Sequence, residues 1–174
     1  SKRIIFFSFF ILICLIITAY EWQMMNKKKL NYVFGLIFLI FSFYTVYYLR
    51  NEGDFKIFLL VVITCVSTDL GGYIFGKIFK GPKLTKISPN KTYTGMFGGF
   101  FLAIICTNLF FNNYSLLNLG DNEQMSKQVL LIVLLTSLVS QIGDLIISFF
   151  KRKSKIKDTG ILIPGHGGLL DRID

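Results

Sequence analysis

Long apolar runs separated by short polar stretches dominate the pattern of the chain. Five such runs cover residues 4–20, 32–49, 57–78, 95–111 and 129–150. A helix needs about 20 mainly apolar residues to cross the hydrocarbon of a bilayer, and about 17 to 25 are workable. The pattern therefore predicts an all-α integral membrane protein, a polytopic helical bundle. We expect residues 1–174 to form a single transmembrane domain, with residues 151–174 following the last span.

Composition supports this interpretation. Hydrophobic residues make up 53% of the chain and 19 positions are phenylalanine, which is far from the make-up of a soluble domain of this length. The three cysteines, Cys14, Cys65 and Cys106, each lie inside an apolar run without paired spacing. We therefore interpret them as packing residues rather than as a zinc site or a disulfide framework.

The distribution of positive charge predicts the topology. If the ends of the five spans alternate between the two sides of the bilayer, 14 of the 19 Lys and Arg residues fall on one side. The positive-inside rule places that side in the cytoplasm. The sequence thus predicts a multi-pass protein of the cell inner membrane or plasma membrane, with cytoplasmic loops at 79–94 and 151–174. An alternative is that these cations serve orientation only.

Two spans carry an aspartate in the half nearer this basic side. Asp69 shares one helix face with Tyr73 and Lys77, and Asp144 belongs to a polar stripe at intervals of four, four and three residues, Ser140, Asp144, Ser148 and Lys151. A carboxylate inside a span costs a few kcal/mol, so it indicates a partner or a function. Gly72 and Gly76, four residues apart, favour close helix packing.

The stretch 148–174 combines cations, glycines and carboxylates. Cations neutralise phosphate, glycines let backbone N–H groups approach phosphate oxygens, and carboxylates hold Mg²⁺. This mixture is typical of a polyphosphate site. The alternative is a juxtamembrane polybasic segment that adheres to anionic lipid headgroups.

The order of these residues resembles a known signature, that of the phosphatidate cytidylyltransferases, also called CDP-diacylglycerol synthases. The matching positions are Ser148-x-x-Lys151-Arg152, Lys157-Asp158-x-Gly160, Pro164-Gly165-His166-Gly167-Gly168 and Asp171-Arg172-x-Asp174. The loop before the fourth span is similar to the family too, with Ser88-Pro89-x-Lys91-Thr92 and then Gly95. Two positions depart from the family pattern. Thr94 stands where the family often has Glu or Gln, and Tyr93 where it often has Trp.

The resemblance implies transfer of a cytidylyl group from CTP to phosphatidic acid, giving CDP-diacylglycerol and pyrophosphate, with Mg²⁺ as cofactor. On this basis we expect Asp144 and Asp171 to hold the cation, with Asp174 or Asp69 as a further ligand. The residues expected in catalysis, chiefly by clamping phosphates, are Lys151, Arg152, Lys157, Asp158 and Arg172. Those expected to contact substrate are Ser88, Lys91, Thr92, Ser148, Gly167 and Gly168. His166 is either a catalytic residue or a structural donor in a glycine turn.

The expected partners are CTP, phosphatidic acid and membrane lipids, without nucleic acid, and a homodimer remains open. The resemblance also implies further hydrophobic helices upstream and after Asp174, so we expect the chain to be a piece of a longer protein. Three other functions remain as alternatives: a CTP-dependent lipid or polyprenol kinase, a transporter for an anionic solute, and a non-catalytic lipid-binding scaffold.

Overall fold

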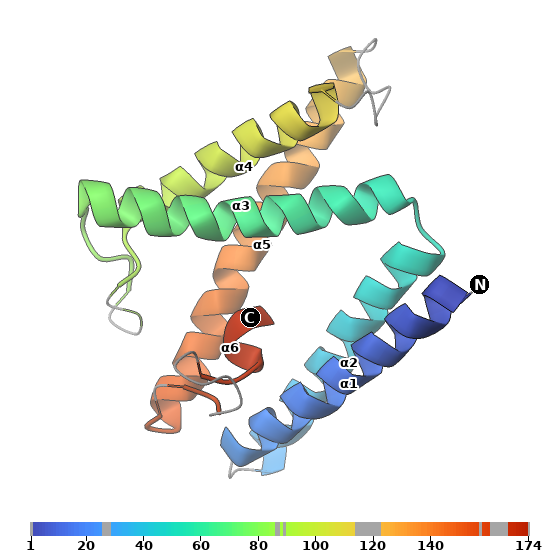
Figure 1. The fold of residues 1–174 in the computed structure, drawn as a ribbon. Helices are drawn as coiled ribbons and strands as arrows, with labels where there is room; N and C mark the ends of the chain where they lie inside the picture. Colours follow the sequence, from blue (N-terminus) through green and yellow to red (C-terminus); the bar gives the residue numbers. More distant parts are fainter. Residues whose placement is uncertain are drawn as a thin grey trace. The chain divides into compact units, whose positions relative to one another are not determined.

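The protein is almost entirely helical. The computed structural model describes residues 2–25, 29–85, 88, 90–113, 123–156, 158–160 and 167–173. Its helices are α1 (Lys2–Met25), α2 (Lys29–Asn51), α3 (Phe55–Phe79), α4 (Tyr93–Asn113), α5 (Glu123–Lys153) and the short α6 (Leu170–Ile173) (Figure 1). Lys83 and Thr92 form an isolated antiparallel β-bridge. The predicted all-α class is therefore confirmed.

Five of the helices are long and apolar enough to cross a membrane, with candidate spans Ile4–Met25, Asn31–Asn51, Phe55–Phe79, Tyr93–Phe110 and Lys127–Lys153. Large apolar side chains stay exposed along them: Phe6 is 74% exposed, Phe41 68% and Val139 66%. In water such exposure would be unfavourable, whereas in hydrocarbon these side chains meet a solvent of their own kind. The structure thus supports a multi-pass membrane protein.

The chain divides into two compact units. We call the first the α1–α2 unit; it comprises residues 1–55 and 147–174. We call the second the α3–α4 unit, residues 56–146. Helix α5 contributes to both, because its last residues, from Ile147 onward, belong to the α1–α2 unit.

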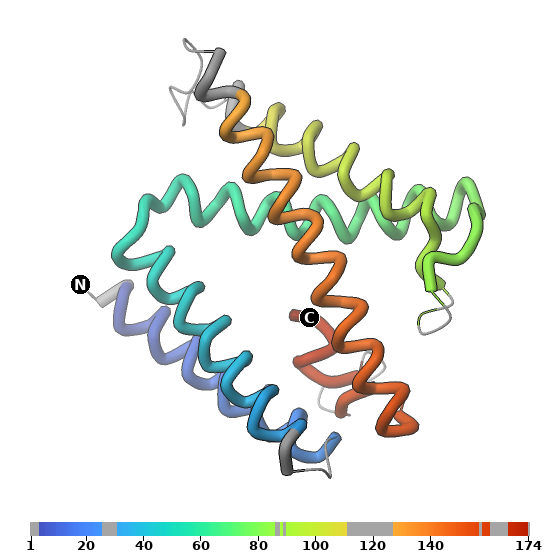
Figure 2. Tube along the Cα trace, turned by 180° about the vertical axis from the view of Figure 1, so that it is seen from behind, coloured from blue at the N-terminus to red at the C-terminus, as the bar shows by residue number. Residues whose placement is uncertain are grey.

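In the α1–α2 unit the two N-terminal helices lie side by side and antiparallel (Figures 1 and 2). Gly35 permits this approach, since a Cβ at this position would overlap the indole of Trp22. Trp22 is 3% exposed, and its Nε1–H donates to the backbone oxygen of Tyr32 at 3.3 Å. Leu170 of α6 and Ile147 of α5 belong to the same apolar core. The C-terminal stretch is therefore packed onto the first two helices.

In the α3–α4 unit, small residues let two helices meet. A Cβ on Gly71 would lie 2.5 Å from the backbone oxygen of Gly98, and a Cβ on Gly95 would lie 2.7 Å from that of Gly72. Helix α5 joins through a buried hydrogen bond, in which the hydroxyl of Thr68 donates to that of Ser137 at 2.8 Å. Close packing was expected at Gly72 and Gly76. A Cβ on Gly76 would lie 3.1 Å from Oγ1 of Thr92, which agrees with that expectation, whereas a Cβ on Gly72 would lie 3.8 Å from its nearest neighbour, so the tightest contact of α3 is at Gly71 instead.

Candidate active site

The end of α5 directs the chain into the candidate site. The N–H of Ile156 donates to the oxygen of Lys151 and the N–H of Lys155 to that of Arg152, both at 3.0 Å. Lys155 has φ +59°. These features define a Schellman cap, which ends a helix and turns the chain aside. A non-glycine residue at positive φ costs about 1 kcal/mol. Beyond this cap, Thr159 binds the same carboxylate as Lys151, that of Asp171.

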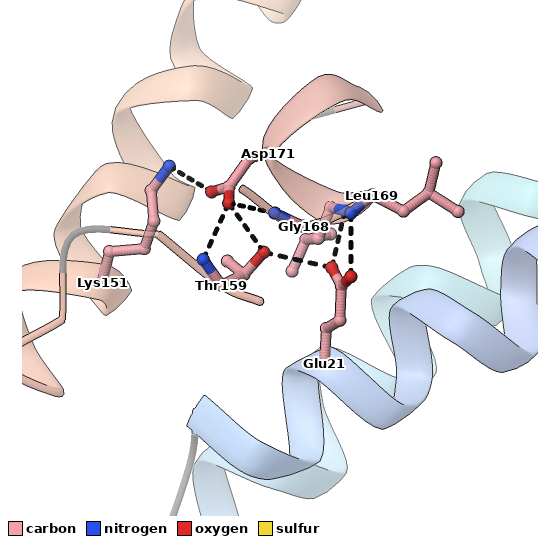
Figure 3. Close-up of polar contacts among 7 residues, drawn as sticks. Glu21, Lys151, Thr159, Gly168, Leu169 and Asp171 are labelled. Atoms are coloured by element: carbon pink, nitrogen blue, oxygen red, sulfur yellow. Dashed lines mark hydrogen bonds and ion pairs between the residues drawn. The ribbon is translucent and has the colours of Figure 1, made fainter. Parts of the chain in front are cut away.

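Asp171 is the centre of the polar cluster that results (Figure 3). Its Oδ1 accepts from Nζ of Lys151 at 2.8 Å. Its Oδ2 accepts from the N–H of Thr159 at 2.7 Å, the hydroxyl of Thr159 at 3.0 Å and the N–H of Gly168 at 2.9 Å. The side chains of Asp171 and Lys151 are 8% and 15% exposed. Both carboxylate oxygens are therefore engaged by donors from three segments.

This environment favours the ionised form of Asp171. Burial alone would raise the pKa of the carboxyl group, because it disfavours the charged form. The hydrogen bonds from Lys151, Gly168 and Thr159, together with the positive charge of Lys151, outweigh that effect and hold the pKa below its ordinary value. Asp171 is therefore a fixed negative charge at neutral pH.

A second carboxylate, Glu21 of α1, binds the same segment from the other side (Figure 3). Its Oε1 accepts from the N–H of Leu169 at 2.8 Å, and its Oε2 accepts from the N–H of Leu170 at 2.8 Å. Oε2 also lies 3.1 Å from the hydroxyl of Thr159. Glu21 is 2% exposed. One acid of the first helix thus satisfies two backbone donors at the start of α6, which have no partner within that helix.

The two glycines before α6 are required by this arrangement. Gly167 has φ +87°, a backbone conformation that residues other than glycine rarely adopt. A Cβ on Gly168 would come within 2.5 Å of Oε2 of Glu21 and would also meet the hydroxyl of Thr159. Both glycines were predicted to contact substrate. In the structure the N–H of Gly168 donates to Asp171, so its observed function is to orient that carboxylate.

In the α3–α4 unit, Asp144 is the centre of a separate polar contact. Its Oδ2 lies 2.6 Å from Nζ of Lys91, and the two side chains are 26% and 29% exposed. Lys91 is held by its own loop, because its N–H donates to the oxygen of Ser88 at 3.1 Å and its oxygen accepts from the N–H of Leu84 at 2.7 Å. The structure therefore brings together two residues predicted for different functions, a metal ligand and a substrate contact.

Thr92 has a structural function that the sequence analysis did not assign. Its hydroxyl accepts from the N–H of Gly95 at 3.1 Å, which makes Thr92 the N-cap of α4. The same hydroxyl lies 3.0 Å from that of Thr94. Contact between Thr92 and a nucleotide stays a prediction.

The remaining predicted residues fall into two groups. Those that the structure describes are Asp69 on α3, Ser88 in the loop, Ser148 and Arg152 on α5, Asp158 after the cap, and Arg172 on α6. Arg152, Asp158 and Arg172 are exposed. Lys157, His166 and Asp174 lie outside the described residues. Among the residues that are described, no three His, Cys, Asp or Glu side chains gather as a ready-made metal centre.

Comparison with known proteins identifies the family. A profile of the cytidylyltransferase family matches residues 2–174. The chain belongs to the cytidylyltransferase family. It is 36% identical to a phosphatidate cytidylyltransferase of Rickettsia conorii over 176 residues, covering 95% of this chain and 74% of that protein. A phosphatidate cytidylyltransferase of Rickettsia prowazekii is 37% identical, with 88% and 69% covered, and one of Staphylococcus aureus strain COL is 35% identical, with 99% and 64% covered.

The resemblance expected from the signature is thus confirmed. The structure also adds to the candidate site one residue that sequence reasoning missed, Glu21. Glu21 is not among the residues that the sequence analysis assigned to the site. One signal could have identified it. Glu21 is the one acidic residue between Ser1 and Arg50, and it stands at the end of an otherwise apolar run. An acid in that position indicates a partner.

Proposed function

We propose that this chain transfers a cytidylyl group from CTP to phosphatidic acid. The observation that carries the proposal is membership of the cytidylyltransferase family, joined to relatives named phosphatidate cytidylyltransferase. In the reaction, a phosphate oxygen of phosphatidic acid forms a bond to the α-phosphorus of CTP. The bond between the α-phosphorus and the oxygen that bridges it to the β-phosphorus breaks, and pyrophosphate leaves with that oxygen.

Chemistry of this kind depends on alignment and charge neutralisation rather than on a covalent nucleophile. The α1–α2 unit supplies suitable cations near Asp171, because Lys151 is fixed by its ion pair and Arg152 and Arg172 are exposed at the ends of their helices. Arginine can bind phosphate through two parallel hydrogen bonds. In our proposal these side chains bind the phosphates of the two reactants and hold them in line.

The carboxylates fit a bound Mg²⁺ to different degrees. Mg²⁺ is usually held by one or two carboxylates, with phosphates and waters completing its six ligands. Asp144 fits, because among the described residues only Lys91 binds it, through Oδ2, and Oδ1 stays open. Asp171 has four donors on its two oxygens, so it fits only if a donor such as Lys151 turns to a phosphate. When bound, the ion would neutralise charge on the triphosphate.

The predicted orientation completes the proposal. The loop that carries Lys91 and the stretch from 151 to 174 belong to the side with 14 of the 19 cations. By the positive-inside rule this side faces the cytoplasm. CTP is a water-soluble anion, and a cytoplasmic site would receive it directly.

The experiment uses the protein purified in detergent with phosphatidic acid, Mg²⁺ and CTP labelled at the α-phosphate. We expect label to enter the lipid, with one pyrophosphate released for each labelled lipid. A parallel reaction with CTP labelled at the γ-phosphate should leave the lipid unlabelled. Transfer of the γ-label instead would indicate a lipid kinase and refute the proposal, as would the absence of any labelled lipid.

A further inference from the structure

Glu21 is a buried acid that is not among the residues assigned to the reaction. It lies on α1, 138 residues before Thr159 in the chain, and is 2% exposed. Each of its oxygens accepts a backbone N–H at 2.8 Å. A buried carboxylate that is fully supplied with donors is held in one position. Among the described residues the hydrogen-bond partners of Glu21 are Leu169 and Leu170, in the segment that carries Asp171, and Thr159.

That segment cannot order itself. Helix α6 has four residues, and a helix of that length is not stable by its own hydrogen bonds. Its position therefore depends on outside contacts, namely Glu21, which accepts from the N–H of Leu169 directly before the helix and from that of Leu170, and the apolar core that contains Leu170. Without the carboxylate, the N–H groups of Leu169 and Leu170 would be left without that partner.

Thr159 links the two acids. Its hydroxyl lies 3.1 Å from Oε2 of Glu21 and 3.0 Å from Oδ2 of Asp171. A hydroxyl has one proton and two acceptor lone pairs, so it donates to one carboxylate at a time. Its N–H donates to Asp171 at 2.7 Å. Fixing Thr159 therefore fixes the N–H that donates to Asp171 and keeps the hydroxyl within hydrogen-bond distance of both acids.

The helix that carries Glu21 is a rigid support. The next residue, Trp22, donates to the backbone of Tyr32 and packs edge-on against Phe150 of α5, with ring centroids 5.0 Å apart. Its indole fills the space left by Gly35. The position of Glu21 is thus set by α2 and by the end of α5 together.

We propose that Glu21 is a positioning residue for the cytidylyl transfer: it anchors Thr159 and the first turn of α6 to α1, and so holds Asp171 in its working orientation. The inference rests on the proposed function for its kinetic part only. Glu21 acts through Thr159 and the α6 backbone.

The kinetic test compares Glu21→Gln with Glu52→Gln, a matched change at an exposed acid that follows α2. Gln keeps the shape of Glu but places an NH₂ donor against N–H and O–H donors. We expect kcat to fall about 10- to 100-fold, the range seen when a partner that orients a ligand is lost. The KM for phosphatidic acid should change little, and Glu52→Gln should behave as the unaltered protein.

A second pair separates positioning from general stability. Thr159→Ser keeps the hydroxyl and should retain activity close to that of the unaltered protein, whereas Thr159→Val should lower kcat as Glu21→Gln does. All rates are taken well below each variant's Tm. Equal kcat values for the valine and serine variants, or a full kcat in Glu21→Gln, would overturn the inference. If Glu21→Gln does not fold, the Thr159 pair decides alone.

The structural part has a measurement that needs no turnover. Amide hydrogen exchange in the peptide 167–173, followed by mass spectrometry, should be at least about tenfold faster in Glu21→Gln, which corresponds to about 1.4 kcal/mol. Unchanged exchange would refute the anchoring. If exchange is faster in Glu21→Gln but the unaltered protein makes no CDP-diacylglycerol, the anchoring is retained and the proposed function is refuted. The two failures are therefore distinguishable.

Discussion

A single methyl group on Gly168 is the sharpest test of the polar cluster. Gly168 is buried, and a Cβ built on it would lie 2.5 Å from Oε2 of Glu21 and even nearer to the hydroxyl of Thr159. Its φ lies outside the left-handed region, so alanine meets no backbone strain there. Any destabilisation by Gly168→Ala therefore comes from steric overlap of the new methyl group and not from backbone strain. Glu21 and Thr159 must move apart from the new methyl group, and they are the side chains that hold the segment.

The magnitude follows from these contacts. Forcing a methyl group into a filled site costs about 1–3 kcal/mol. Loss of one hydrogen bond to a charged group costs about 1.5–3 kcal/mol. The two overlap in part, because the movement that relieves the methyl group is the movement that breaks the bond. We expect docking of residues 167–173 to weaken by about 3 kcal/mol.

Trp22 provides the assay, since it is the only tryptophan in the chain and shares a core cluster with Leu170. Its emission should shift to the red at a lower denaturant concentration in Gly168→Ala than in the unaltered protein. Gly143→Ala is the control. A Cβ there meets nothing within 4 Å, and alanine in a helix interior stabilises by about 0.5–1 kcal/mol. Equal midpoints for Gly168→Ala and Gly143→Ala would show that the cluster does not hold the segment.

Three further predictions follow from the geometry. Asp144→Asn should abolish labelled-lipid formation while the protein still elutes as a folded species, and substantial retained activity would remove Asp144 from the site. Because the pKa of Asp171 is lowered, its contribution to stability should be complete above the unfolded-state pKa of about 3.9 and be lost as the pH falls through the lower folded value, which an acid titration of Trp22 emission would detect. Gly71→Ala, whose Cβ would lie 2.5 Å from the oxygen of Gly98, should lower stability by about 1–3 kcal/mol. Gly72→Ala should be tolerated, since its Cβ would lie 3.8 Å from its nearest neighbour, and a comparison of the Tm values of the two variants checks this.

Sequence reasoning predicted the helices because length and apolarity alone decide them in a membrane protein. The predicted ends were less accurate. The first run was expected to stop at Tyr20, whereas α1 continues to Met25. A hydropathy pattern ends where polar residues begin, but a helix continues as long as its backbone hydrogen bonds form. Glu21 and Trp22 lie in the five residues by which α1 extends beyond the predicted end, and for this reason the error in the helix end affects the interpretation of the site.

Among the polar contacts, those local in sequence were predictable and distant ones were not. The expected helix face of Tyr73 and Lys77 is observed, with Nζ of Lys77 donating to the phenol oxygen at 3.3 Å. The bond between Glu21 and Thr159 could not be foreseen, since no periodicity relates residues 138 positions apart. Thr92 is an intermediate case, because a threonine directly before a helix is a recognisable N-cap.

The two acids expected to bind metal, Asp144 and Asp171, have one feature in common. Each is paired with a lysine from one of the two stretches that resemble the family, 88–95 and 148–174. Lys91 binds Asp144 at 2.6 Å and Lys151 binds Asp171 at 2.8 Å. A buried or intramembrane carboxylate is unfavourable without a counter-charge, so each lysine stabilises the acid that it binds. Phosphates compete for the same lysines. A lysine that turns toward a phosphate leaves a carboxylate oxygen open, which is the hard donor that a divalent cation requires. We therefore expect each lysine to serve two successive functions, first neutralising its acid and then binding a phosphate of a reactant.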